Sequence, residues 1–183
     1  MKRALLSPFG RFRRFRRRTS GGVATIEFVL IFLPMFVLSV SGFELGLLMT
    51  RQVMLERGMD ITVREVRLNT GVNQTNMDLR RSICNGAGII QNCMQRVRLE
   101  MLSIDPDNWT DPPAKASCTN IAEPFEAPRN FKNGSQNQVM LLRACGLFEP
   151  MLPDFALGWT LSRMEDDGHY RLHATSAFVM EPR

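Results

Sequence analysis

The sequence lacks the short motifs that would place it in a common class of enzyme. It contains no G-x-x-x-x-G-K-[ST] phosphate loop, no G-x-S-x-G nucleophile turn and no H-E-x-x-H zinc motif. It has only two histidines, His169 and His173, which a strand would hold about 13 Å apart along its length. The sequence therefore predicts that the protein is not an enzyme and that it uses no metal and no cofactor.

Charge is absent from a long stretch near the N-terminus. No charged residue lies between Glu27 and Glu44, and the apolar character extends from Val23 to Met49. An α-helix needs about 20 apolar residues to cross a bilayer, so this stretch of about 27 residues is long enough to cross with some tilt. The sequence predicts one membrane-spanning helix here and shows no second stretch of this kind.

Acidic residues are absent from residues 1–22, which carry eight of the 23 Lys and Arg. The remaining 15 basic residues face 18 Asp and Glu, so the positive net charge belongs to this tail. A basic tail can bind nucleic acid or anionic lipid, but its place directly before an apolar helix is typical of a cytoplasmic flank. We expect a cytoplasmic N-terminus, an outer C-terminal domain and no nucleic-acid partner. A secretory signal peptide cut near Ser41 is an alternative.

The four cysteines all follow the apolar stretch, in the part of the chain predicted to be outside the cytoplasm. An even number of cysteines in an oxidising compartment indicates two disulfides, for which three pairings exist. The short spacing of Cys84 and Cys93 suits a local bridge, which would leave Cys118 to pair with Cys145. A zinc site is the alternative, but the chain has no C-x-x-C pair and both histidines lie far along the sequence.

The pattern of the chain predicts an α+β protein in three parts. Residues 1–22 form a basic leader, residues 23–49 a transmembrane helix that continues as a stalk to about residue 70, and residues 72–183 an extracytoplasmic domain. In the stalk, Leu55, Met59, Thr62 and Val66 recur at helical spacing and predict a buried face. The sequence Asn69-Thr70-Gly71 is a helix stop.

The rest of the chain predicts a short helix and an antiparallel sheet packed on the extended helix. A capping box at Thr75 to Asp78 opens the short helix. Strands are predicted at 96–101, with one charged, solvated face, at 139–148 and at 170–180. Residues 105–134 predict a long surface loop that contains Cys118, residues 151–157 a helical turn, and residues 166–168 a hairpin turn.

Glu27 requires an explanation, since a carboxylate near the start of a membrane helix costs a few kcal/mol if it stays in lipid. It could reach the membrane surface, or it could pair with a positive group inside an assembly. A free α-amino group at Val23 would be such a partner, on the same chain or on a neighbour. That pairing requires cleavage after Gly22.

The segment Gly22/Val23-Ala24-Thr25-Ile26-Glu27-Phe28, between a basic tail and an apolar helix, resembles type IV pilin-like precursors of Flp-type (Tad) systems. The longer stretch looks like the N-terminal region of TadE-like pseudopilins, with Pro34 matching an early proline and Glu44 and Gly46 a second E-x-G element. Thr25 departs from the usual alanine. The closing stretch, residues 174–182, is similar to the last strand and Glu-Pro of these proteins. The residues between carry no matching motif.

This resemblance implies a minor pseudopilin, TadE- or TadF-like, with a pilin-like fold in the bacterial inner membrane. It implies a processing site formed by Gly22, Val23, Glu27 and Phe28, and cleavage by a prepilin peptidase. The implied partners are that peptidase, other pilins and pseudopilins, and Tad assembly proteins. The implied role is assembly of a pilus for adhesion, biofilm formation and surface attachment. The alternative is an uncleaved anchor, with a single membrane span and a periplasmic binding or scaffolding domain.

Overall fold

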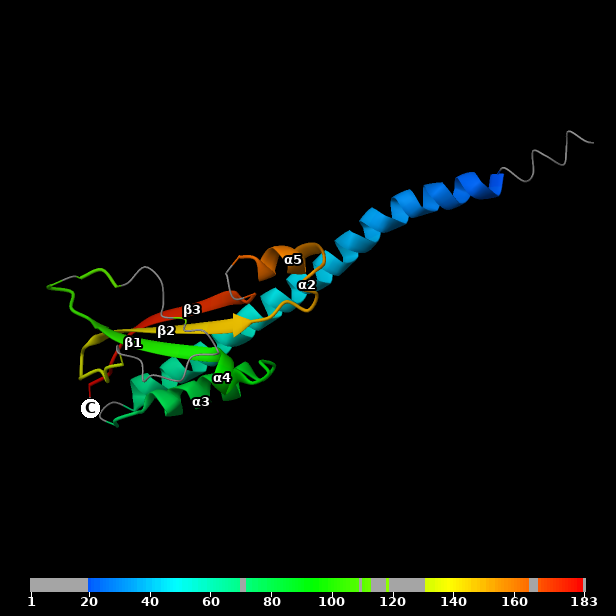
Figure 1. The fold of residues 1–183 in the computed structure, drawn as a ribbon. Helices are drawn as coiled ribbons and strands as arrows, with labels where there is room; N and C mark the ends of the chain where they lie inside the picture. The colour runs from blue at the N-terminus through cyan, green and yellow to red at the C-terminus, as the bar shows by residue number, and fades with distance from the viewer. Residues whose placement is uncertain are drawn as a thin grey trace, which may run out of the picture. The chain divides into compact units, whose positions relative to one another are not determined.

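The structure, a computed structural model, describes residues 20–69, 72–108, 110–112, 118, 131–164 and 168–182. The chain divides into two compact units, residues 1–42 and 43–183, which are described separately below. Helix α2 (Ser20–Leu68) contributes its first part to one unit and its second part to the other (Figure 1). The basic tail before Ser20, Gly71, the first two residues of the predicted 166–168 turn and most of the predicted 105–134 loop lie outside the described residues.

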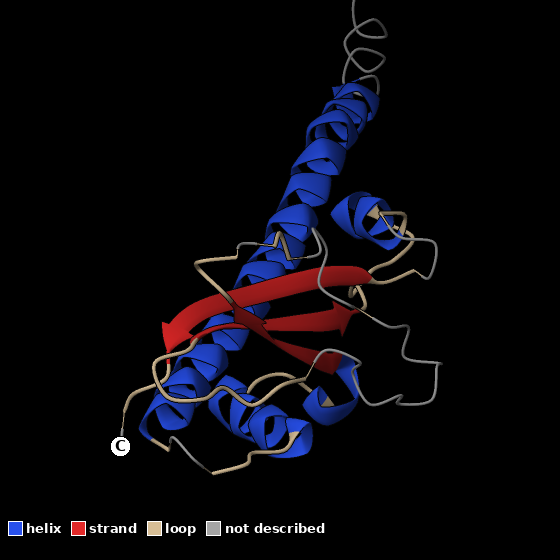
Figure 2. Cartoon of the chain, turned by 90° about the vertical axis from the view of Figure 1, so that its left-hand side faces the viewer, coloured by secondary structure: helices blue, strands red, loops and turns tan. Residues whose placement is uncertain are grey.

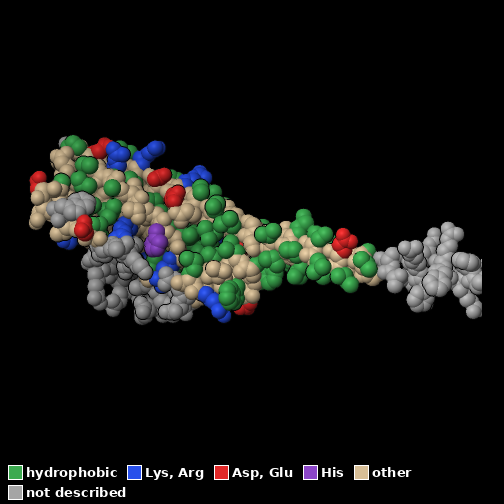
Figure 3. Space-filling view, turned by 90° about the horizontal axis from the view of Figure 1, so that it is seen from above, with side chains coloured by type: hydrophobic (Ala, Val, Ile, Leu, Met, Phe, Trp, Pro, Cys, Tyr) green, Lys and Arg blue, Asp and Glu red, His purple; other side chains and the backbone are tan. Residues whose placement is uncertain are grey.

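In the first unit, the described residues form the apolar half of helix α2. The helix begins three residues before the predicted Val23 and continues through Pro34. Its large apolar side chains are exposed, and the space-filling view shows hydrophobic side chains over this part of the helix (Figure 3). By length and composition, α2 could cross a membrane, which is consistent with the predicted span.

The second unit holds a three-stranded antiparallel sheet with β2 in the centre (Figure 2). Its strands are β1 (Val97–Ile104), β2 (Val139–Phe148) and β3 (Tyr170–Val179). Leu142 of β2 faces Met101 of β1 on one side and Ser176 of β3 on the other. The helices of this unit are the remainder of α2, α3 (Asn76–Ala87), α4 (Cys93–Arg96) and α5 (Ala156–Ser162). The predicted mixture of helices and antiparallel sheet is confirmed.

The core lies between one face of the sheet and the helices α2 and α3. The predicted α2 face is buried, with Leu55 and Thr62 fully inaccessible. Helices α2 and α3 approach closely at Gly58 and Gly86, where a Cβ atom on Gly58 would lie 2.4 Å from the Ile83 carbonyl oxygen. The long helix is therefore an integral part of this core.

Several predicted boundaries agree with the structure and others do not. Strand β2 has the predicted bounds, β3 ends one residue early, and α3 begins after the Thr75 cap with the predicted capping box. The helical turn predicted at 151–157 was misplaced, because Phe155 is extended and α5 begins only at Ala156. The four-residue helix α4 was not predicted.

The prediction that the charged face of β1 is solvated was wrong at Glu100. Glu100 is buried, and the sheet register places it opposite Arg143, which is also buried. The two side chains form an ion pair at 3.8 Å. Because Arg143 on the neighbouring strand β2 supplies the opposite charge, an acid can be buried at this position.

Candidate functional site

The residues of the predicted processing site lie on the first turns of α2. Val23, Glu27 and Phe28 are all exposed, and Gly22 has open space around it. The Gly22–Val23 bond is close to the helix start at Ser20, where helices fray.

Val23 and Glu27 are four residues apart in the helix, so their side chains project from the same face. A cut before Val23 would create a positive amino group one turn from the Glu27 carboxylate. The geometry is compatible with a pair within one chain, and the exposure of Glu27 leaves it equally accessible to a neighbouring helix.

Three phenylalanines form an aromatic ridge along the same part of α2. The ring centroids of Phe28 and Phe32 are 5.3 Å apart, and those of Phe32 and Phe36 are 5.8 Å apart. All three side chains are about half or more exposed. Such a ridge offers a contact surface to lipid or to another apolar helix.

In the second unit, the most unusual side chain is that of Glu44, which is only 2% exposed. Both of its carboxylate oxygens accept the backbone N–H of Met151, at 3.0 and 3.1 Å. A buried carboxylate is stable only when hydrogen bonds replace water, and this contact provides one. Glu44 therefore fixes the Met151 backbone to α2.

Two turns further along α2, the Arg51 side chain joins the helix to the sheet. Its Nη1 donates to the Glu149 carbonyl at 3.1 Å and also contacts the Tyr170 hydroxyl. The guanidinium lies 5.4 Å from the centroid of the Phe148 ring. Burial raises the pKa of the Tyr170 hydroxyl, while the Arg51 hydrogen bond opposes this shift. Tyr170 therefore stays neutral at ordinary pH.

The Glu149 side chain contacts two further polar side chains. It forms an ion pair with Arg96 at 3.5 Å and contacts His169 Nε2 at 3.2 Å. Arg51, Arg96 and Glu149 line an open groove of about 420 Å³ whose other walls include Leu47, Ile89, Ile90, Pro150 and Met151. Arg96 pairs with the Glu149 carboxylate and Arg51 bonds to the Glu149 carbonyl, so the arrangement serves to hold α2, α4 and the end of β2 together.

The sequence does not predict the contacts of Arg51 and Arg96 with Glu149. Glu44 is predicted only as part of the E-x-G element of the resemblance, and no pattern in the sequence singles out Arg51. The available signal was Glu44 itself, a single acid directly after a charge-free helix.

The structure brings the four cysteines together in two pairs. The Cα atoms of Cys84 and Cys93 are 5.6 Å apart, and those of Cys118 and Cys145 are 5.7 Å apart, both bonded as disulfides. The first bridge joins α3 to α4 and the second ties Cys118 to the central strand.

The distance of the histidines along the sequence was a poor argument against a metal site. The register of β2 and β3 places His173 opposite Cys145. The ligand atoms of Cys118, Cys145 and His173 lie within 4.8 Å of one another, and no other metal-ligand cluster occurs in the described part of the chain. With both sulfurs in a disulfide, only the imidazole is left as a ligand, so the oxidised protein has no metal site here.

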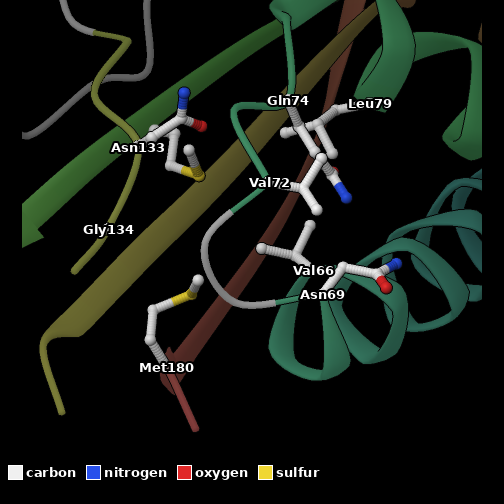
Figure 4. Close-up of a pocket in the computed structure, with 9 residues that line it drawn as sticks. Val66, Asn69, Val72, Gln74, Leu79, Asn133, Gly134 and Met180 are labelled. Atoms are coloured by element: carbon white, nitrogen blue, oxygen red, sulfur yellow. The ribbon is translucent and has the colours of Figure 1, made fainter. Parts of the chain in front are cut away.

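A second, much smaller cavity lies where α2 ends (Figure 4). Its volume is about 10 Å³, and its walls include Val66, Val72, Leu79, Gly134 and Met180. A space of this size holds about one water molecule. It is a packing gap between the end of α2 and the loops around it.

Fold and site define a class of protein: a mixed helix–sheet unit with disulfide-paired cysteines, built on an N-terminal helix that could cross a membrane. Comparison of the chain with protein families, with characterised proteins and with solved structures finds no match.

Proposed function

We propose that this protein is a minor pseudopilin of a Tad/Flp-type pilus assembly system, processed after Gly22 by a prepilin peptidase. The observation that carries the proposal is the sequence Gly22-Val23-Ala24-Thr25-Ile26-Glu27-Phe28 at the exposed start of a long apolar helix. The expected location is the bacterial inner membrane, with the tail in the cytoplasm and the disulfide-bonded unit on the periplasmic side. The charge of the tail and the cysteine pairs support this orientation.

The proposed mechanism is assembly. The basic leader holds the precursor in the cytoplasm until the peptidase removes it. The new amino group at Val23 is then neutralised by Glu27 of an adjacent subunit, which fixes the axial register between helices. The phenylalanine ridge of α2 supplies apolar contact between helices, and the outer unit mediates contacts at the tip or base of the pilus.

Complementation of a deletion strain tests this role. We expect loss of the gene to abolish surface pili and attachment, and the intact gene to restore both. Glu27→Gln keeps the size of the side chain but removes its charge, so we expect the variant to reach the membrane without restoring pili.

The matched control is Glu56→Gln, which changes an exposed acid on the same helix, hydrogen-bonded to Gln52 and outside the apolar stretch. This variant should restore pili. If Glu27→Gln also restores them fully, the charge pairing is wrong. If deletion leaves pili intact, the uncleaved scaffolding anchor becomes the better interpretation.

A further inference from the structure

The segment from Pro150 to Met164, which contains α5, packs beside the second part of α2 (Figures 1 and 2). The position of this contact along the helix is informative. A hydrocarbon core of about 30 Å corresponds to about 20 helical residues. A core that begins at Phe28, directly after Glu27, therefore ends near Leu47, which places Glu44 inside its last turn.

A carboxylate facing lipid there is unfavourable unless a partner covers it. Glu44 is protected, because it is buried and accepts the Met151 backbone N–H. The Pro150–Met164 segment thus covers the acid and is attached to α2 at the level where the apolar stretch ends.

The segment exposes several large apolar side chains, together with Asp154 and Arg163. Five large side chains are each 40% to 68% exposed, namely Met151, Leu152, Phe155, Trp159 and Met164. The Arg163 guanidinium lies 4.1 Å from the centroid of the Trp159 ring. Tryptophan and arginine with apolar neighbours are typical of the membrane–water interface, where the ring is half-immersed and the cation reaches the headgroups.

The segment holds this shape through its own contacts. The Ser162 hydroxyl donates to the Pro153 carbonyl at 3.0 Å, and Gly158 packs against the Leu152 carbonyl so tightly that a Cβ atom would lie 2.1 Å from it. The apolar surface is therefore preformed, and no folding on contact is needed to present it.

We propose that the Pro150–Met164 segment docks on the lipid bilayer surface on the outer side and shields Glu44 from lipid. This inference rests on the membrane-spanning part of the proposed function. A phospholipid surface is the occupant, because the segment is attached to α2 where the apolar stretch ends and carries exposed apolar side chains beside the Trp159–Arg163 pair.

Depth-dependent quenching of tryptophan fluorescence tests the inference on the full chain in phospholipid vesicles. The chain has two tryptophans, so Trp109→Phe leaves Trp159 as the only reporter. Two reference variants carry both Trp→Phe changes and one new reporter each. Leu38→Trp reports on the apolar part of α2, and Leu68→Trp on an exposed position 24 residues beyond Glu44.

We expect lipids brominated near the headgroup to quench most of the Trp159 emission, and lipids brominated deep in the acyl chain to quench Leu38→Trp. Aqueous iodide should quench Leu68→Trp strongly and Trp159 several-fold less. If Trp159 responds to iodide as strongly as Leu68→Trp does, while Leu38→Trp is quenched by lipid, the docking is wrong and the membrane span stands.

Two other outcomes also overturn the inference. Shielding of Trp159 from both iodide and lipid would show that protein, not lipid, covers the segment. Failure of lipid to quench Leu38→Trp would show that α2 does not span the bilayer, and the proposed function would fail with it.

Discussion

The carboxylate of Glu44 and the backbone of Met151 lie 107 positions apart in the sequence, and the carboxylate residue of this pair is only 2% exposed. The Met151 N–H donates to both carboxylate oxygens of Glu44. Loss of the carboxylate would remove a charge-assisted hydrogen bond that joins this N–H to α2.

Glu44→Leu should therefore lower the free energy of unfolding of the second unit by about 1 to 3 kcal/mol. Glu44→Gln keeps one acceptor oxygen and should cost less. Denaturant unfolding of the full chain in detergent, followed by the signal of the sheet, measures both. Asp60→Asn, at an exposed acid of the same helix, is the control and should change stability by less than about 0.5 kcal/mol. Equal effects of Glu44→Leu and Asp60→Asn would show that the contact contributes nothing.

At the scale of an element, the packing of α2 against α3 depends on the absence of a side chain at Gly58. A Cβ atom there would meet the Ile83 carbonyl oxygen at 2.4 Å and the Ala87 nitrogen at 3.2 Å. Both are backbone atoms, so relief requires movement of a whole helix. Overpacking of this kind costs about 1 to 3 kcal/mol, which exceeds the gain of about 1 kcal/mol in helix propensity.

We expect Gly58→Ala to lower the thermal midpoint of the second unit and Gly46→Ala, on the same helix with open space around it, to leave it unchanged or raise it. Thermal unfolding followed by circular dichroism compares the two variants. A Gly58→Ala protein as stable as Gly46→Ala would contradict the close approach of α2 and α3.

The start of α3 should make stability depend on pH. The Thr75 hydroxyl and backbone N–H both bond to the Asp78 carboxylate, and these bonds lower the pKa of Asp78. Since the folded-state pKa lies below the unfolded value of about 3.9, the contribution is complete above that pH and is lost as pH falls through the folded pKa.

Unfolding between neutral pH and about pH 3, near the unfolded pKa of Asp, tests this dependence. Asp78→Asn should be less stable at neutral pH and should lose less stability on acidification than the unaltered chain. Thr75→Ala, which removes the cap, should cost about 1 kcal/mol at neutral pH. If the stability of Asp78→Asn and that of the unaltered chain changed equally with pH, the Asp78 carboxylate would not contribute to the capping box.

At the scale of the whole molecule, the two disulfides close loops of different size. The bridged cysteines are 9 and 27 positions apart, and in the chain-entropy model such loops stabilise by about 2.6 and 3.6 kcal/mol. Replacing both cysteines of the Cys118–Cys145 pair by serine should therefore destabilise more than the same change at Cys84 and Cys93. Thiol titration of the unfolded, unreduced protein should find no free thiol. A free thiol, or the reverse order of stabilities, would contradict the pairing.

The sequence predicts features that depend on neighbouring residues better than contacts between residues far apart in the chain. The buried face of α2 and the bounds of β2 follow from local hydrophobic spacing, and both agree with the structure. The contacts of Glu44 with Met151 and of Arg51 with Tyr170 join positions 107 and 119 apart, so no local pattern reveals them. His173 lies beside Cys145 only because of the strand register. The processing motif was recognised by resemblance, and its cleavage remains a prediction.

The mass of the membrane-associated chain, with mapping of its N-terminal peptide, tests the central claim most directly. A chain that begins at Val23 is predicted, together with an uncut chain when Gly22→Phe blocks the peptidase. Gly42→Ala, at a glycine with open space outside the motif, should leave cleavage intact. A mature chain that keeps the arginine-rich tail would contradict the pseudopilin assignment and favour the uncleaved anchor.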